Sequence, residues 1–284
     1  MEHYDDDDRE TVVSQSISHY APSTGRPPSY IGGISYSDDE RTMQHVNDGL
    51  SILHYHQDPK NHVWERKYIS AELRSGAWDM IATPIEGLPN AWTFPVFTPA
   101  ACAELVHHLS GKNTSIEGGG DPTWVTSTDA WSNSNGNRGY KQTEKKLYPR
   151  GAFHTVYTSI LRNYIHPLLC TVTGGWKKDA KGLAHDTHFV RIGGEGTYDH
   201  TKPHFDESTY TVTVCLNEEG VDYSGGTFVF SGSTQQVFAV PKGHAVLHLG
   251  GPAHKHGVRP VTKGRKFDMT SLVRFKRITN DDME

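Results

Sequence analysis

The sequence has few cysteines and no excess of basic residues. Its 284 residues include only Cys102, Cys170 and Cys215, with no Cys-x-x-Cys pair. We therefore expect neither a disulfide framework nor a zinc ribbon, and we interpret the three thiols as small core residues. The formal net charge is −5. Charge alone thus gives no reason to expect a nucleic-acid partner.

Long apolar runs and a secretion signal are also missing. No stretch approaches the roughly 18 consecutive apolar residues of a spanning helix. The N-terminus, MEHYDDDDRE, is acidic where a signal peptide would be basic and then apolar. As it stands, the sequence predicts a cytoplasmic protein without a membrane span. If it is a piece of a longer protein of the secretory pathway, we expect the endoplasmic reticulum instead.

The chain divides into three predicted parts. Residues 1–42 combine an aspartate run with Ser, Pro and Gly and show no periodicity, which indicates a flexible arm. We expect a helical lead-in segment over 43–92 and the main domain over 93–284. Within that domain, apolar residues at helical spacing over 153–168 predict a helix packed on a sheet.

Short β-like runs dominate after residue 185. Six of them follow one another, separated by glycine-rich turns and without a helical period between them. Helical signals lie before them. The predicted fold class is therefore α+β, with a jelly-roll core over 185–276, also called a double-stranded β-helix, and flanking helices. Such a core leaves a mouth for a ligand.

The run PHFDES at 203–208 carries the main chemical signal. Positions i and i+2 of an extended chain face the same way, so His204 and Asp206 can chelate one ion at the start of a strand. The run GGPAHKHG offers His254 and His256 as a third ligand. Two imidazoles and one carboxylate with open positions are the ligand set of non-haem Fe(II) oxygenases. A surface ion pair is the plain alternative.

The segment RKFDMTSLVRF supplies a candidate anion-binding group. Strand alternation places Arg265 on one face with Phe267 and Met269, so we interpret it as an inward-facing cation that needs a partner. A dicarboxylate cosubstrate could supply that partner through a bidentate salt bridge. Lys266, on the opposite face with Asp268, is expected to point to solvent.

The motifs KPHFDESTYTVTVCLNEEGVDYSGGTFVF and PKGHAVLHLGGPAHKHGVRPVTKGRKF, in this order, resemble the catalytic domain of procollagen lysyl hydroxylases. These are 2-oxoglutarate- and Fe(II)-dependent dioxygenases. The resemblance implies that His204, Asp206 and His256, rather than His254, hold the iron. It also implies that Arg265 grips the distal carboxylate of 2-oxoglutarate.

The same resemblance places Arg191 and Asn217 near the cosubstrate. The family usually has a tyrosine after the matching arginine, whereas this chain has Ile192. Ascorbate is implied as a reductant, a collagen-like peptidyl lysine as the substrate and a homodimer as a possible assembly.

An independent hint favours a lysine substrate. Seven acidic residues lie between positions 195 and 222, and they would attract a substrate ammonium: Glu195, Asp199, Asp206, Glu207, Glu218, Glu219 and Asp222. Several of them could equally sit on solvated turns. A prolyl hydroxylase or another 2-oxoglutarate oxygenase remains an alternative. A non-redox jelly roll of cupin type is an alternative of another class, but it gives Arg265 no role.

Overall fold

The computed structural model describes Ile52 and residues 62–110, 132–134, 142–146, 152–175, 180–194, 198–230 and 236–275. The predicted arm over 1–42 and the residue Glu195 lie outside these ranges. Within them, none of the helices combines the length and the hydropathy that a membrane crossing requires.

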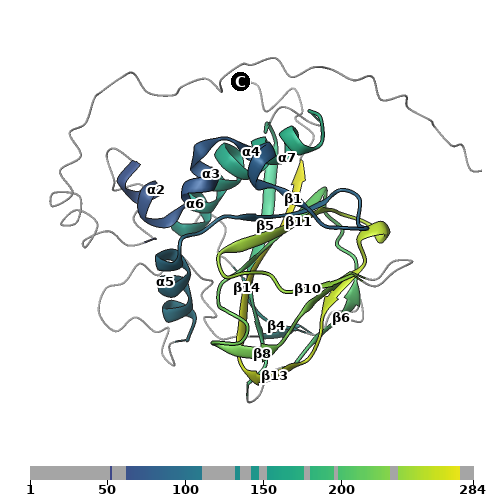
Figure 1. The fold of residues 1–284 in the computed structure, drawn as a ribbon. Coiled ribbons are helices and arrows are strands. Elements are labelled where there is room, and N and C mark those ends of the chain that lie inside the picture. The colour runs from purple at the N-terminus through teal and green to yellow at the C-terminus, as the bar shows by residue number, and fades with distance from the viewer. Residues whose placement is uncertain are drawn as a thin grey trace, which may run out of the picture. The chain divides into compact units, whose positions relative to one another are not determined.

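The largest sheet of the described residues is antiparallel and has eight strands (Figure 1). Their order across the sheet is β1 (Thr83–Pro84), β2 (Ala91–Pro95), β11 (His244–Leu249), β7 (Tyr210–Cys215), β14 (Lys266–Phe275), β5 (Leu183–Ile192), β4 (Gln142–Lys146) and β3 (Ser132–Ser134). Strands distant in sequence thus lie side by side, as β2 and β11 do.

Two smaller antiparallel sheets complete the β structure that is described. One has the order β10 (Gln236–Phe238), β9 (Phe228–Phe230), β12 (His256–Val258) and β6 (Thr201–His204). The other pairs β13 (Val261–Gly264) with β8 (Tyr223–Gly225). Because β6 ends the four-stranded sheet, it has a hydrogen-bonded neighbour on one side only.

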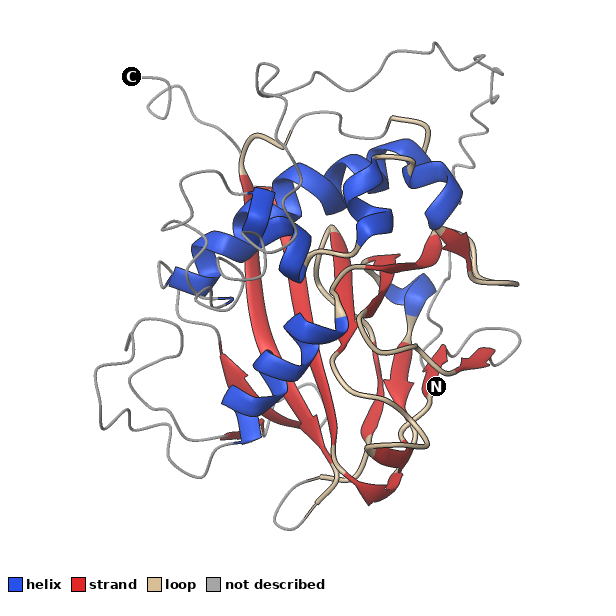
Figure 2. Cartoon of the chain, turned by 60° about the vertical axis from the view of Figure 1, so that its left-hand side comes forward, coloured by secondary structure: helices blue, strands red, loops and turns tan. Residues whose placement is uncertain are grey.

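Helices cover one face of the eight-stranded sheet (Figure 2). They are α2 (His62–Tyr68), α3 (Ala71–Ser75), α4 (Trp78–Ile81), α5 (Pro99–Ser110), α6 (Ala152–Ile160), a π-helical turn (Leu161–Ile165) and α7 (His166–Val172). The hydroxyl of Thr98 accepts a hydrogen bond from the Ala101 amide at 3.3 Å and so caps α5. The bounds of α6, the π-helical turn and α7 confirm the helix predicted over 153–168, with the π-helical turn as an interruption.

Both faces of the large sheet are buried. On the helix side, Phe153 and Tyr157 of α6 pack in one cluster with Phe189 of β5 and Met269 of β14. On the other side, a second cluster joins residues of β5 and β7 to the smaller sheets, and it consists of Val190, Ile192, Cys215, Tyr223, Phe228, Phe230, Val240, Val246, Val258 and Val261. Two facing sheets with helices outside one of them form a double-stranded β-helix, which confirms the predicted fold class.

The boundary predicted between residues 92 and 93 falls inside a strand. β2 runs from Ala91 to Pro95 and pairs along its length with β11. Upstream, Trp64, Tyr68 and Leu73 are fully buried in the same helix-side cluster as the sheet. Residues 62–92 therefore pack with the main domain, because their apolar side chains join the cluster over the sheet.

Candidate metal centre and adjoining pocket

The ends of two paired strands bring the predicted ligands together. His204 ends β6 and His256 begins β12, and the two are direct partners in the antiparallel register. The strands approach closely next to this pair, since a Cβ on Gly257 would lie 2.6 Å from the carbonyl oxygen of Thr201. Only glycine fits there. Asp206 lies two positions after the end of β6, and its carboxylate lies close to both imidazoles.

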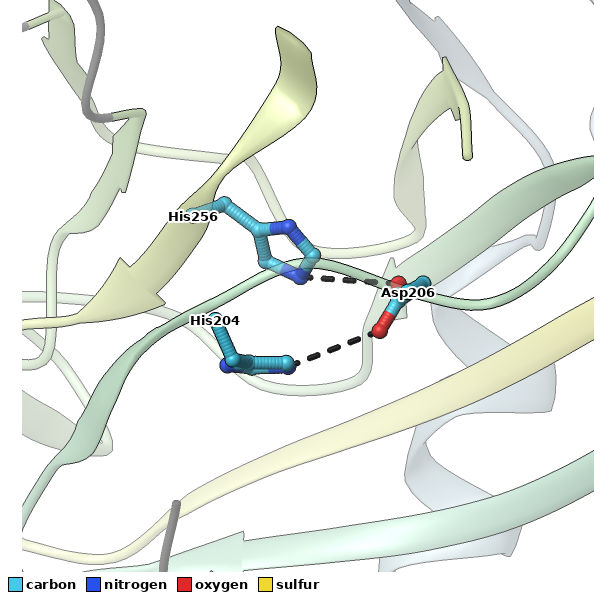
Figure 3. Close-up of side chains that lie close together, drawn as sticks. All are labelled: His204, Asp206 and His256. Carbon is cyan, nitrogen blue, oxygen red and sulfur yellow. Dashed lines mark ion pairs between the residues drawn. The ribbon is translucent and has the colours of Figure 1, made fainter. Parts of the chain in front are cut away.

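Figure 3 shows the two imidazoles and the carboxylate converging. The Nε2 atom of His204 lies 3.5 Å from Oδ1 of Asp206, and Nε2 of His256 lies 3.6 Å from Oδ2. One donor atom from each of the three residues falls within 4.8 Å of the others. A single cation at the centre can contact all three.

The tautomer of each histidine suits a metal ligand. Nδ1 of His204 lies 2.9 Å from the carbonyl oxygen of Lys202, and Nδ1 of His256 lies 2.9 Å from that of His254. A carbonyl only accepts, so each Nδ1 is the protonated nitrogen and each Nε2 carries the lone pair. Backbone acceptors behind the ring are the usual support of metal-binding imidazoles. Phe228 stacks on His256 at 5.4 Å between ring centroids.

The carboxylate of Asp206 is kept ionised although the residue is only 8% exposed. Burial opposes ionisation, but His204, His256 and His248, together with the Thr211 hydroxyl, hold the pKa of Asp206 below its ordinary value. That hydroxyl donates to Oδ2 at 2.7 Å. Burial also lowers the pKa of His256 to about 4, so its imidazole is neutral near pH 7. These are the protonation states that a divalent cation requires.

Two further histidines lie beside the triad. Nε2 of His254 lies 2.8 Å from the carbonyl oxygen of Pro89 and is thereby engaged away from the centre. His248 of β11 is fully buried, and its Nε2 lies 3.9 Å from Asp206. Burial lowers the pKa of His248 to about 3. It thus adds a neutral ring, and not a charge, to the wall behind the carboxylate.

A pocket between the two larger sheets opens from the triad. It encloses about 490 Å³, its solvent-open mouth included, within the range of small-molecule sites. It is lined by His188, Val190, Ile192, Thr201, His204, Asp206, Thr213, Phe228, His256, Gly257, Val258, Asp268, Thr270 and Leu272. The walls beyond the triad combine apolar residues, such as Val190, Ile192 and Leu272, with polar ones, such as Thr213 and Thr270. Three consecutive even-numbered positions of β14 face this space.

Arg265, expected to face the cosubstrate, is not among the described residues that line the pocket, and its role as a cosubstrate ligand stays a prediction. Arg265 precedes β14, and Phe267 and Met269, which follow it at alternate positions, belong to the helix-side cluster. The Arg265 guanidinium lies against Gly194, where a Cβ would meet its Nε at 2.8 Å. Arg191 is its neighbour, and burial together with the charge of Arg265 lowers the pKa of Arg191. Neither arginine is among the described residues that line the pocket.

Lys266 is not directed to solvent, as the sequence suggested, but is 3% exposed. It lies on the pocket side of β14, where its Nζ forms a short ion pair with Asp268 Oδ1. Burial alone would lower the pKa of Lys266, but the carboxylate of Asp268 holds it above its ordinary value. The alternation was predicted correctly; the face that lines the jelly roll was not, because both faces are covered.

Asn217 holds the backbone at the start of β14 through two hydrogen bonds. Its Nδ2 donates to the carbonyl oxygen of Arg265 at 2.7 Å, and its Oδ1 accepts from the Phe267 amide at 2.9 Å. The amide side chain thereby clasps the backbone on both sides of Lys266. It is 4% exposed, and it is not one of the described pocket residues.

The acidic residues predicted around the metal do not gather at the pocket. Asp199, Glu207, Glu218 and Asp222 are exposed, and of the described residues in that set only Asp206 lines the pocket. Asp268 is the buried carboxylate that strand alternation had grouped with the solvent-facing residues. Its strand position, two after Lys266, was the signal that could have identified the pair.

Sequence comparison relates the chain to procollagen lysyl hydroxylases, as the motifs indicated. It is 27% identical over 253 residues to human procollagen-lysine,2-oxoglutarate 5-dioxygenase 1, covering 86% of this chain and 31% of that protein. It is 25% identical over 259 residues to a procollagen lysyl hydroxylase and glycosyltransferase of Acanthamoeba polyphaga mimivirus, covering 84% of this chain and 26% of the viral protein. The chain thus spans about a third or less of the length of these relatives. No protein-family model matches it.

Among solved structures, the chain shows similarity to the prolyl hydroxylase of Trichoplax adhaerens in complex with a hypoxia inducible factor oxygen degradation domain peptide fragment. It aligns with a TM-score of 0.44 at 14% identity, covering 74% of this chain and 96% of that one.

Proposed function

We propose that this chain is a 2-oxoglutarate- and Fe(II)-dependent dioxygenase that hydroxylates a C–H bond, with peptidyl lysine as the substrate. The observation that carries the proposal is the convergence of His204, Asp206 and His256 within 4.8 Å in the lining of one pocket. The relationship to proteins named as 2-oxoglutarate dioxygenases supports it independently.

The three ligands fit Fe(II). Imidazole nitrogens and one carboxylate oxygen on one side of the ion leave other positions open for a 2-oxo acid and dioxygen. Bound iron would supply the activation of dioxygen, with one oxygen atom entering the substrate and the other entering succinate as 2-oxoglutarate loses CO₂. The protein's part is to hold the ligands in their neutral and ionised states and to keep water from the apolar wall formed by Val190, Ile192 and Leu272.

We assign the distal carboxylate of 2-oxoglutarate to Lys266 in place of Arg265. Lys266 pairs with the pocket residue Asp268 of β14, whereas Arg265 precedes that strand and, like Arg191, is not one of the described pocket residues. Its ammonium, already paired with Asp268, can share its charge with a ligand carboxylate. The Asn217 clasp fixes the backbone on both sides of Lys266 and so acts as a positioning residue, not as a ligand of the cosubstrate.

The substrate assignment rests on the lysyl hydroxylase relationship. The human relative's name specifies procollagen lysine. Phe205, which lies between two of the ligands in the sequence, is 45% exposed and offers an apolar contact to a peptide. The same relationship supports ascorbate as a reductant and a homodimer as the assembly; light scattering of the purified chain tests the dimer.

Mass spectrometry of peptide products tests the function. Purified protein with Fe(II), 2-oxoglutarate and ascorbate is offered matched collagen-like peptides that carry Lys or Pro at one target position. We expect one oxygen atom to be added to the lysine peptide, with succinate formed in equal amount. Oxygen on the proline peptide alone would instead make the chain a prolyl hydroxylase. Succinate formation with neither peptide would leave the reaction type standing and reject the peptide substrate.

A further inference from the structure

The ion pair of Lys266 and Asp268 borders the pocket through one of its two partners only. Asp268 is among the residues that line the pocket, whereas Lys266, its partner, is not. Both residues are 3% exposed. The pair thus borders the pocket through its carboxylate, and the ammonium is already paired with it. A ligand carboxylate that enters the pocket therefore meets a lysine that shares its charge with Asp268.

The lysine is fully engaged in this arrangement. Its Nζ contacts Asp268, lies 3.7 Å from the Cys215 sulfur and sits 5.8 Å from the centre of the Tyr223 ring. Burial raises the pKa of Cys215 and of Tyr223, so both are neutral near pH 7. The local charge is thus one cation and one anion, which sum to zero.

A dicarboxylate changes that balance. If its distal carboxylate joins the pair, two anions share one cation in a site that excludes water, and like charges in such a site repel strongly. If it displaces Asp268, a buried carboxylate loses its partner. Either route lowers the net gain from the ammonium. A 2-oxo acid with an uncharged tail meets neither cost.

We propose that Asp268 is a specificity-determining residue that withholds the charge of Lys266 from the distal end of the cosubstrate and so sets a weak preference for dicarboxylates. This inference rests on the proposed function and refines it. The pocket binds a 2-oxo acid through the metal, and the distal end of that acid meets Lys266, whose charge is balanced by Asp268. Replacing the carboxylate of Asp268 by an amide converts the site into one that favours 2-oxoglutarate strongly.

Anaerobic titration calorimetry of the Fe(II)-loaded protein measures this preference without turnover. The ligands are 2-oxoglutarate and its 5-methyl ester, which differ in the distal charge. Wild-type protein is expected to bind the two within about tenfold of each other. Asp268→Asn is expected to bind 2-oxoglutarate at least about tenfold more tightly than wild type does, since a like charge at contact distance is gone. Its affinity for the ester should stay the same.

The control variant is Asp79→Asn, which removes an exposed carboxylate from α4 and should change neither affinity. Thermal unfolding checks that each variant is folded. If Asp268→Asn does not fold, Asp268→Val, which suits a strand, replaces it, and the comparison of the two ligands on wild type stands without either variant.

Three results separate the hypotheses. Equal affinity of wild type and Asp268→Asn for 2-oxoglutarate overturns the role of Asp268 and leaves the dioxygenase proposal intact. The role of Asp268 is also overturned if wild type binds 2-oxoglutarate far more than tenfold more tightly than the ester. Failure of both ligands to bind any folded, iron-loaded variant overturns the proposed function itself.

Discussion

The polar side chains on the two sides of the eight-stranded sheet differ in what satisfies them. On the helix side, Ser271 lies between the hydroxyls of Thr187 and Tyr157 at 3.0 and 3.1 Å, and His185 lies between Thr187 and Thr158 at 2.7 and 2.8 Å. These five side chains form a chain of hydrogen bonds. They need nothing from outside the protein.

On the pocket side, two imidazoles and one carboxylate converge within 4.8 Å of one another. The lone pairs of two imidazoles and the charge of Asp206 share one centre, and a carboxylate with rings around it is stabilised further by a cation. The difference indicates that the helix side serves stability and that the pocket side serves binding. Changes on each face should therefore have separable effects.

The largest expected effect is loss of the metal centre. Asp206→Ala removes the only anionic ligand of the triad, so we expect 2-oxoglutarate turnover to fall to background while the circular dichroism spectrum is retained. Metal content after loading with Fe(II) measures the cause directly. Turnover close to wild type in this variant would refute the triad, and a chelator followed by fresh Fe(II) should abolish and then restore wild-type activity.

A smaller effect, on the affinity for 2-oxoglutarate, is expected from replacing the neighbouring basic residues Arg265 and Lys266. Lys266→Met, made in Asp268→Asn protein so that no single buried charge remains, should weaken 2-oxoglutarate binding by about a hundredfold relative to Asp268→Asn. Arg265→Met, at a position that is not one of the described pocket residues, should change that affinity by less than about twofold. Calorimetry measures both. The reverse ranking would restore Arg265 as the cosubstrate ligand.

Core truncation on the helix side should affect stability alone. Met269 is fully buried among apolar residues. Met269→Ala is expected to lower the free energy of unfolding by about 2–5 kcal/mol, through lost burial and the cavity left behind. Urea unfolding measures the change. Affinity for 2-oxoglutarate, measured where the variant is folded, should match wild type; a large loss would mean that the two faces are coupled.

The smallest effect is an acid sensitivity to which two buried histidines on the pocket side contribute. Burial lowers the pKa of His248 to about 3 and of His256 to about 4, whereas both are near 6.5 in the unfolded chain. Below pH 6.5 the unfolded state therefore binds more protons, and stability falls as the pH decreases. Between pH 7.5 and 5.5 the metal-free protein should lose about 1 kcal/mol for each histidine.

Urea unfolding at the two pH values in the presence of a chelator measures this loss. His248→Gln removes one of the two groups, so its stability should depend less on pH than that of wild type. An identical dependence in the two proteins would contradict the assignment to His248.

Local patterns in the sequence predicted much of this molecule. Alternation and turn chemistry after residue 185 predicted the jelly roll, and the His204–Asp206 spacing predicted a chelating pair that the fold does bring together with His256. Both features depend on residues near one another in the chain. The assignment of iron and of the cosubstrate to these residues stays a prediction.

Local patterns could not predict which side of β14 lines the pocket. Periodicity shows that Arg265 and Lys266 point in opposite directions, but it does not show which side is the pocket when both sides are buried. A strand exposed on one face would have placed the charged residue in solvent. Here the partner of Lys266 lies two positions away on the same strand, and only the arrangement of the two sheets reveals that this pair is internal.

The position of β6 at the edge of the four-stranded sheet gives bound metal a second consequence. The strand is hydrogen-bonded on one side only, and it ends at His204, opposite His256 of β12. An ion held by both residues cross-links the edge strand to its neighbour. By mass action, a ligand that binds only the folded state stabilises it. Iron supply would then govern the resistance of this edge to fraying and proteolysis, and with it the lifetime of the protein, before any substrate is bound.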